Sequence, residues 1–272
     1  MAVADTTLVV IHVILHRINI MYFPPSFLFL TPVCIVNIVA YIVTVDCSVW
    51  FTVAFTFDRF VAICCQKLQS KYCTEKTATV VMGSVFVLSC LRTVPFYFMN
   101  EPAFIIDNVA WYCVPTADYL TSPLSKVFEW IDSIITPVLP MFLILLFNAL
   151  TVRHIIVANR IRKGLRSNNE NQNDLEMKNR RKSMVLLFTI SANFIILWMT
   201  YLVHSVNWPI MNFYYTDKYL SSPIYIAQQV AFMLQLLSSC TNTCIYGLTQ
   251  NKFREEIKNG IKYLFTLNGK IC

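Results

Sequence analysis

One apolar segment of this sequence, Trp50–Cys64, reads WFTVAFTFDRFVAIC and carries an acid and a base near its end, Asp58 and Arg59. The apolar run to which it belongs begins near residue 26 and reaches about residue 63. Roughly 20 mostly apolar residues suffice for a helix to cross a bilayer, because only a helix closes all its backbone hydrogen bonds inside hydrocarbon. We therefore predict one long membrane-spanning helix over residues 26–63.

The composition of the whole chain agrees with a membrane protein. Its 272 residues are 56% hydrophobic and 14% charged, whereas an ordinary soluble domain carries roughly 25% charged residues. A disordered chain needs the opposite balance, and a soluble globule needs more polar residues to cover its surface. The ten cysteines are too dilute to indicate a small disulfide-rich scaffold. The fold class that we predict is an all-α membrane protein.

Five further apolar stretches are predicted to cross the membrane. The six predicted spans lie at about residues 1–15, 26–63, 77–99, 127–157, 182–207 and 222–249. We predict that residues 1–250 form one transmembrane bundle. Residues 251–272 are predicted to form a short amphipathic helix on the membrane surface, followed by a tail.

Lysine and arginine residues predict the orientation of the spans. Eighteen of the 22 basic residues fall in the loop after the second span, in the loop between the fourth and fifth spans, and in the tail. These regions share one side if six spans alternate, and the positive-inside rule makes that side, with the C-terminus, cytoplasmic. The net charge of +7 is therefore explained by topology and by attraction to anionic membrane lipids. Nucleic acid is not an expected partner.

The first span has an unusual sequence. Residues 1–14 are apolar, contain Asp5, and are preceded by no basic residue. A signal peptide has a positively charged start and an uninterrupted apolar core, which this segment lacks. We expect a span that is entered part-way, with further sequence missing upstream. Asp46, a second acid inside a predicted span, is expected to form a hydrogen bond with a neighbouring helix.

Considered by itself, Asp58-Arg59 could equally be a functional motif or a simple ion pair at a helix end. Three spacings favour a functional motif. Cys34 precedes Arg59 by 25 residues, which is about 37 Å of helix at about 1.5 Å per residue, the thickness of a bilayer plus one interface. Ser48 lies eleven residues before Arg59 on the same predicted helix. Residues 242–246, reading NTCIY, precede a short basic amphipathic stretch.

These residues resemble the motifs of the rhodopsin-like (class A) G-protein coupled receptors. The third helix of that family has an outer cysteine, an inner small polar residue and a terminal Asp-Arg-aromatic motif, which Cys34, Ser48 and Asp58-Arg59-Phe60 match. The other matching positions are Asp5 for the second helix, Pro140 for the fifth, Phe194 and Trp198 for the sixth, and Asn242, Tyr246, Phe253 and Arg254 for the seventh helix and the surface helix. On the fifth helix, Asn148 takes the place of the usual tyrosine. The resemblance covers the whole chain and implies a rhodopsin-like helical bundle in the plasma membrane.

Within the family, Trp50–Cys64, Leu187–Ile190 and Asn148 look most like the orphan branch around probable G-protein coupled receptor 139. Two features depart from the family pattern. The first helix and the start of the second are missing, which leaves six spans instead of seven and puts independent folding in doubt. Thr200 and Thr243 stand where the sixth and seventh helices usually carry proline, which puts the usual hinge motions in doubt.

The resemblance implies a disulfide and an ion site. Cys34 is expected to bond Cys113 in the long outer loop, because the oxidising outside lets a disulfide persist; the alternative is two unpaired thiols. The side chains implied to hold a sodium ion at mid-membrane are Asp5, Ser48, Ser239 and Asn242. Hard cations prefer such oxygen ligands. The alternative is a hydrated hydrogen-bond network without an ion, and no other cofactor is expected.

The resemblance also assigns residues to coupling and activation. Arg59 would contact Asp58 in the inactive state and face a heterotrimeric G protein in the active state. The coupling residues are Asp58, Arg59, Phe60, Asn148 and Tyr246, and the activation switch is Phe194 with Trp198. Arg180 and Arg181 stand where many relatives carry an acid that clamps the arginine. We therefore expect a weakly restrained inactive state.

The outer halves of three spans are expected to line a ligand site. The candidate residues are Tyr41, Ile42, Val45, Trp198, Tyr201, His204, Gln228, Phe232 and Gln235. Amine receptors carry an acid at the position of Tyr41, so a monoamine ligand is disfavoured. Aromatic and amide side chains suit an aromatic amino-acid-like or peptide ligand. For each of these side chains the alternative is ordinary helix packing.

The function that we infer is a receptor that transmits an extracellular small-molecule or peptide signal to a heterotrimeric G protein. A non-signalling, truncated receptor fragment is the main alternative. A small transporter or channel fits less well, because the spans hold few polar residues along a continuous path and the halves do not resemble each other. An enzyme is not expected, because the spans contain no His/Glu zinc motif and no Ser/Lys pair.

Overall fold

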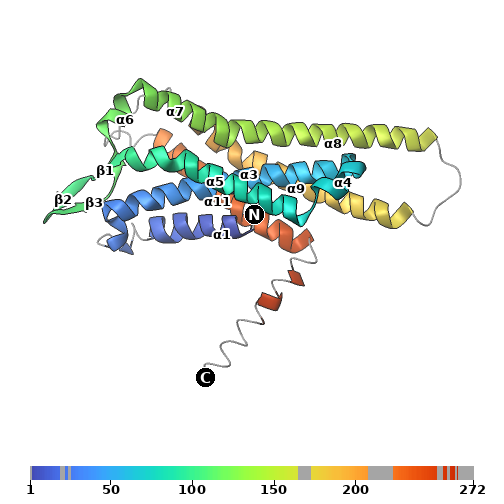
Figure 1. The fold of residues 1–272 in the computed structure, drawn as a ribbon, viewed down its shortest axis with the longest axis horizontal. Coiled ribbons are helices and arrows are strands. Elements are labelled where there is room, and N and C mark those ends of the chain that lie inside the picture. The colour runs from blue at the N-terminus through green and yellow to red at the C-terminus, as the bar shows by residue number, and fades with distance from the viewer. Residues whose placement is uncertain are drawn as a thin grey trace.

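The computed structural model describes residues 2–18, 22–23, 26–164, 173–207, 223–249, 254–255, 258–260 and 262. Within these residues the chain is a bundle of long helices that run side by side, with short strands at one end (Figure 1). The α-helices are α1 (Ala2–Val9), α3 (Thr31–Cys64), α4 (Gln66–Tyr72), α5 (Glu75–Phe98), α6 (Ala117–Thr121), α7 (Pro123–Ser133), α8 (Leu139–Gly164), α9 (Asn173–Asn207) and α11 (Pro223–Thr249). A 3-10 turn, η2 (Phe27–Phe29), precedes α3, and two π-helical segments, η1 (Val10–Ile18) and η3 (Ile134–Val138), continue α1 and α7.

The helices confirm an all-α membrane bundle. Four helical stretches are long and apolar enough to cross a membrane: Thr31–Cys64, Glu75–Phe98, Pro123–Ala158 and Met184–Asn207. A shorter apolar helix covers Val3–Leu15. Helices also lie at the other predicted spans, but the count of six membrane crossings stays a prediction. The predicted surface helix at 251–272 falls mostly outside the described residues.

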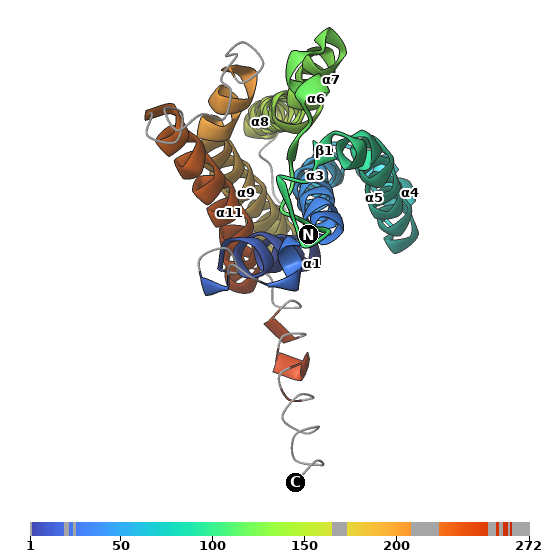
Figure 2. The ribbon, with the colours of Figure 1, turned by 90° about the vertical axis from the view of Figure 1, so that its left-hand side faces the viewer.

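The long helix α3 lies at the centre of the bundle. It packs against α1, α5, α8 and α9, and Figure 2, which views the end that carries the strands, shows α5 on one side of it and α9 on the other. Cys34 lies near the beginning of this helix and Arg59 near its end. The two residues whose spacing suggested a bilayer-spanning helix therefore belong to one continuous helix.

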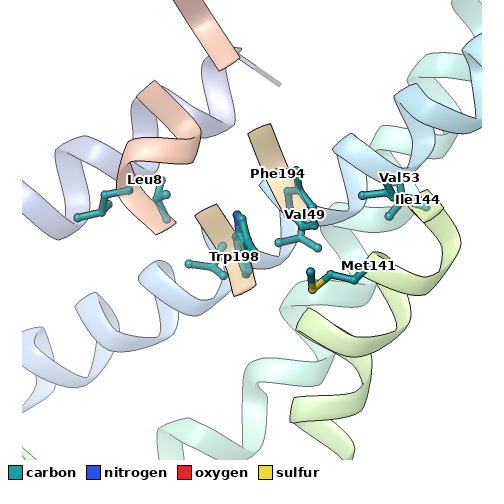
Figure 3. Close-up of a cluster of buried hydrophobic side chains, with 9 residues drawn as sticks. Leu8, Val49, Val53, Met141, Ile144, Phe194 and Trp198 are labelled. Atoms are coloured by element: carbon teal, nitrogen blue, oxygen red, sulfur yellow. The ribbon is translucent and has the colours of Figure 1, made fainter. Parts of the chain in front are cut away.

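A cluster of buried apolar side chains holds the middle of the bundle together (Figure 3). Its members come from five helices and are Leu8, Val45, Val49, Val53, Met141, Ile144, Phe194, Trp198 and Leu236. Lipid tails are as apolar as these side chains, so the cluster is stabilised by close packing more than by escape from water. Other large apolar residues, such as Leu88 and Phe142, are exposed, which is the pattern expected of surfaces that face lipid.

The outer loop between α5 and α6 forms a small set of antiparallel strands that the sequence analysis did not predict. β2 (Phe104–Ile106) pairs with β3 (Val109–Trp111), and β1 (Asn100–Glu101) pairs with β4 (Val114–Pro115). The tight turn between β2 and β3 consists of Asp107 and Asn108, which both have positive φ angles. Asp and Asn tolerate this backbone region better than most residues, and such a turn matches the twist of a two-stranded ribbon.

A disulfide between Cys34 and Cys113 confirms the predicted bond and ties this loop to α3, with the two Cα atoms 6.0 Å apart. Two hydrogen bonds add to the attachment. The Tyr112 amide donates to the Phe29 carbonyl at 2.7 Å, and the Thr31 hydroxyl donates to the Tyr112 carbonyl at 2.7 Å. The loop is therefore fixed across the N-terminal end of the central helix.

Prolines and threonines shape the helices differently. Pro137 lies inside η3, where a π-helical turn replaces the regular hydrogen-bond pattern between α7 and α8. The backbone of α9 continues as an α-helix through Thr200, and that of α11 continues through Thr243. Both helices thus run on where the family pattern usually places proline.

Candidate functional site

A buried polar cluster lies at mid-bundle between α1 and α3. The Ser48 hydroxyl donates to Oδ1 of Asp5 at 2.5 Å, and Asp5 is only 1% exposed. The second carboxylate oxygen, Oδ2, has no hydrogen-bond partner among the described residues. A carboxylate oxygen buried in this way is free to accept a further ligand.

The helix α11, which packs against α1, carries further buried polar side chains. Ser239 and Asn242 are buried there, and so is Ser238, whose hydroxyl has no hydrogen-bond partner among the described residues. Asn193 of α9 donates through Nδ2 to the Asn242 side-chain oxygen at 3.4 Å. The predicted sodium-site residues thus come from three helices that meet in the core.

The predicted coupling motif lies at the other end of α3. Nη2 of Arg59 donates to Oδ2 of Asp58 at 2.7 Å, and both side chains are about one-third exposed. The guanidinium also lies over the Phe55 ring, 5.4 Å from its centroid. Phe60 stacks on Phe147 of α8 with ring centroids 5.7 Å apart. This end of α3 is therefore held to α8 by rings while its ion pair stays open to solvent.

The remaining residues predicted for the cytoplasmic end are placed less completely. Asn148 lies on α8, and its side-chain oxygen is buried without a hydrogen-bond partner among the described residues. The side chains of Tyr246 and Arg180 lie outside the described residues. Arg181 is exposed and lines an apolar groove of about 320 Å³ between α8 and α9, together with Val152, Ile155, Ile156, Met184, Val185 and Phe188. No contact between Arg181 and Arg59 is found in the part of the chain that the structure describes.

The predicted activation switch forms the centre of the apolar core. The Phe194 and Trp198 rings stack with centroids 5.0 Å apart, and both are almost fully buried. Figure 3 shows the two rings beside Val49 of α3. Toward the outer end, the Trp198 ring meets the Tyr201 ring edge-on at 5.4 Å. A ring rotation at Trp198 would therefore disturb packing against the central helix.

Most of the predicted ligand residues gather in one aromatic cluster on the outer side of Trp198. The Phe232 ring of α11 lies 6.0 Å from the Tyr201 ring and 6.2 Å from the His204 ring. On the α3 side, the Tyr41 hydroxyl donates to Oε1 of Gln235 at 3.2 Å. These side chains come from α3, α9 and α11 and converge on one volume. We call this group the outer aromatic cluster; its members are Tyr41, Tyr201, His204, Phe232 and Gln235, together with His12.

The three other predicted ligand residues differ in how deeply they are buried. Val45 is buried in the apolar core cluster against Trp198. Ile42 and Gln228 are half-buried. In contrast, His12 of η1 belongs to the outer aromatic cluster although the sequence analysis did not select it, because its ring stacks on Tyr41 with centroids 4.5 Å apart. It also lies 6.3 Å from the Phe232 ring.

A charged cluster between α3, α5 and α7 was not predicted from the sequence. Arg92 contacts the carboxylates of both Asp46 and Asp132, and its Nε donates to Oδ2 of Asp46 at 3.0 Å. The Thr136 hydroxyl of η3 donates to Oδ1 of Asp46 at 3.0 Å. The expected partner of Asp46 on a neighbouring helix is therefore Arg92. Opposite charges inside separate predicted spans were the signal that could have revealed it.

Comparisons with known proteins agree with this arrangement. The family model described as "7 transmembrane receptor (rhodopsin family)" matches residues 1–246. The chain is 24% identical over 234 residues to "Tachykinin-like peptides receptor 86C" of Drosophila melanogaster, which covers 81% of this chain and 43% of the relative. It is 23% identical over 217 residues to "Rhodopsin, GQ-coupled" of Mizuhopecten yessoensis, which covers 78% of this chain and 42% of the relative.

The chain thus spans less than half the length of these curated relatives. Neither name points to the orphan branch around probable G-protein coupled receptor 139, so that finer assignment stays a prediction. The match of the family model covers most of the 272 residues. The chain therefore belongs to the rhodopsin family of seven-transmembrane receptors.

Proposed function

We propose that this protein is a G-protein coupled receptor that transmits an extracellular signal to a heterotrimeric G protein. The observation that carries the proposal is the single helix α3, which is disulfide-bonded to the loop before α6 at Cys34 and carries Arg59 near its opposite end. Tyr41 of the outer aromatic cluster and Arg59 both lie on this helix. A displacement of the helix at the cluster would therefore also move the partly exposed ion pair at Arg59. Membership of the family supports the same function.

The proposed mechanism is a shift between two packings of the bundle. A ligand that contacts Tyr41 and Phe232 would press on Tyr201 and through it on Trp198. Trp198 packs in the same buried cluster as Val49 and Met141, so its movement would repack α3 against α8. Interior packing has few alternatives, so such a repacking behaves as a switch between two states, which the ligand biases by contacting them unequally.

The ligand that we propose is an aromatic amino-acid-like molecule or a peptide. Supporting this class, the outer aromatic cluster offers ring faces for stacking and the Gln235 amide for hydrogen bonding. The name of one relative gives it peptide ligands, and the name of the other gives it coupling to Gq. A peptide ligand and a Gq-type partner are therefore the first to test.

We propose that Asp5, Ser48, Ser239 and Asn242 hold a sodium ion in the inactive state. The unpartnered Oδ2 of Asp5 and the unpartnered Ser238 hydroxyl fit this proposal, because a hard cation is bound by oxygen atoms. The ion would supply a positive charge next to a carboxylate that is otherwise buried with one hydroxyl donor. Loss of the ion would leave that charge uncompensated and so favour a different packing.

We also propose that the inactive state is weakly restrained. The Arg59 guanidinium has one carboxylate partner among the described residues, Asp58, and this pair is about one-third exposed. Exposed pairs of this kind contribute about 0–1 kcal/mol. A basic residue at Arg181 cannot add an ion pair to Arg59. Basal signalling is the expected consequence.

The test is basal nucleotide exchange in cells that express the full chain at their surface. We expect exchange above that of empty cells, and Arg59→Ala should reduce it to the empty-cell level at equal surface expression. Lys76→Ala, which removes an exposed charge at the beginning of α5, is the matched control and should retain the signal. Equal exchange in expressing and empty cells across all Gα classes would overturn the proposal.

A further inference from the structure

A positively charged side chain lies next to the outer aromatic cluster and was not among the predicted ligand residues. Arg17 is in the last turn of η1 and is half-buried. Its Nη2 donates to Oε1 of Gln229 on α11 at 2.6 Å. Its Nε is buried and has no hydrogen-bond partner among the described residues. One nitrogen of the guanidinium, Nη2, is therefore hydrogen-bonded, whereas another, Nε, lacks a hydrogen-bond acceptor among the described residues.

No described carboxylate pairs with Arg17. Among the described residues, ion pairs join Arg59 to Asp58, and Arg92 to Asp46 and Asp132, but none is found that joins a carboxylate to Arg17. An amide oxygen accepts a hydrogen bond but neutralises no charge. Withdrawing a cation from water without a counter-charge costs free energy, which an incoming anion would offset. Since a guanidinium presents its donors as a planar fork, a carboxylate is the anion that fits it best.

A second unsatisfied donor lies deeper in the bundle on α11, the helix that also carries Gln229. Gln235 is 1% exposed, its Oε1 accepts from the Tyr41 hydroxyl, and its Nε2 has no partner among the described residues. Gln229 and Gln235 are six residues apart on α11, which is about 9 Å along a helix. The structure thus offers a cation at one level and an amide donor about two turns below it.

Aromatic rings lie at the level of the deeper donor. His12 precedes Arg17 on η1, and its ring stacks on Tyr41, the residue that orients Gln235. The Phe232 ring lies 6.3 Å from the His12 ring. A ligand that reached from Arg17 toward Gln235 would therefore place an apolar ring against these side chains.

We propose that Arg17, positioned by Gln229, binds a free carboxylate of the ligand, and that the ligand carries an aromatic ring and a carbonyl acceptor for Gln235. This inference rests on the proposed receptor function and narrows its ligand class to aromatic carboxylates, such as an N-acylated aromatic amino acid or the C-terminus of a peptide. Ligands whose carboxylate is amidated or absent lack the group that Arg17 recognises.

The test compares probes that differ in charge but hardly in shape. The N-acetyl forms of phenylalanine, tyrosine and tryptophan, each as free acid and as amide, are added to the purified full chain in nanodiscs, and the thermal unfolding midpoint is recorded. At least one free acid should raise the midpoint while its amide does not. Arg17→Gln should weaken acid binding about 10- to 100-fold, the range expected for hydrogen bonds to a charged group. Arg153→Gln, an equal charge change on an exposed residue of α8, should leave it unchanged.

A second variant separates ligand binding from a structural role of Arg17. Gln229→Glu places a carboxylate of the chain itself on the guanidinium, so it should raise the midpoint without ligand and abolish the shift caused by the acid. Equal shifts with acid and amide, no shift with any acid, or an unchanged shift in Arg17→Gln would each overturn the proposal. The measurement involves no G protein, so a failure of coupling in the Arg59→Ala experiment is recognised independently.

Discussion

The guanidinium of Arg92 in α5 donates through Nε to the carboxylate of Asp46 in α3 at 3.0 Å, in the interior of the bundle. Asp46 is almost fully buried and also accepts from the Thr136 hydroxyl at 3.0 Å. Arg92 contacts Asp132 of α7 as well. One arginine thus joins three helices. Arrangements of this kind inside a membrane are costly to leave incomplete, because hydrocarbon offers a stranded charge no partner.

Removal of the arginine from this cluster should destabilise the bundle. Arg92→Met leaves the buried Asp46 carboxylate without its cation, and loss of one partner of a buried pair costs about 3–5 kcal/mol. We expect a lower thermal unfolding midpoint and less protein at the cell surface. The matched control is the double variant Asp46→Asn/Arg92→Met, which removes both charges and should recover part of the loss. Equal stability of Arg92→Met and the unaltered protein would show that the pair is dispensable.

The disulfide gives a second prediction about stability. Cys34 and Cys113 are separated by 79 residues, and a loop of that length restricts the unfolded chain by about 4 kcal/mol on the entropy model. Each of the three variants Cys34→Ser, Cys113→Ser and the double variant removes this one bond. All three should therefore lower the unfolding midpoint equally. Cys240→Ser, at an exposed thiol of α11, is the control. Additive losses in the double variant would contradict a shared bond.

Some of the structure follows from the length and spacing of apolar residues. A run that continues from residue 26 to about residue 63 is long enough to predict α3, and the motif positions along it predict that Cys34 and Arg59 lie at opposite ends. The length of α3 and the positions of Cys34 and Arg59 on it are predictable because they depend only on one helix and its rise per residue. The pairing of Cys34 with Cys113 was predictable only through resemblance to the family.

Other parts depend on which helix faces which. Periodicity does not say that Arg92 points at Asp46, or that Arg17 reaches Gln229, because these contacts need the relative rotation of two helices. The π-helical turn at Pro137 and the strands after Phe98 were also missed. A π-helical turn inserts one residue into an otherwise regular pattern, and strands of two or three residues are too short for alternation to be recognised.

Cys73, in the turn before α5, should react slowly with alkylating agents. Burial raises the pKa of its thiol to about 11, helped by its hydrogen bond to the Asp58 carbonyl at 3.7 Å and by the negative charge of Asp58. The thiolate is the reactive form. At pH 8 its fraction is therefore about two orders of magnitude below that of a free cysteine with a pKa near 8.5.

The measurement is the rate of iodoacetamide labelling of Cys73, followed by mass spectrometry of the peptide. Because the pKa is raised in the folded state, the rate should increase as the pH rises toward 11, and unfolding in dodecyl sulfate should increase it at pH 8. Asp58→Asn removes the negative charge and should speed labelling of the folded protein at pH 8. Equal rates for folded and unfolded protein at that pH would contradict the prediction.

Sodium dependence distinguishes an ion site at Asp5 from a hydrated network. If sodium binds only the folded protein, a concentration of about ten times Kd stabilises it by about 1.4 kcal/mol, or about 2–4 °C for a chain of this size. We expect this rise in the unfolding midpoint when sodium chloride replaces N-methylglucamine chloride at constant ionic strength. Asp5→Asn removes the charge that attracts the cation and should abolish the difference. Asp107→Asn, an equal change at an exposed turn residue that asparagine suits, should preserve it. An identical midpoint in the two salts for the unaltered protein would mean that the Oδ2 of Asp5 is satisfied by water, and the proposed sodium ion would have to be given up.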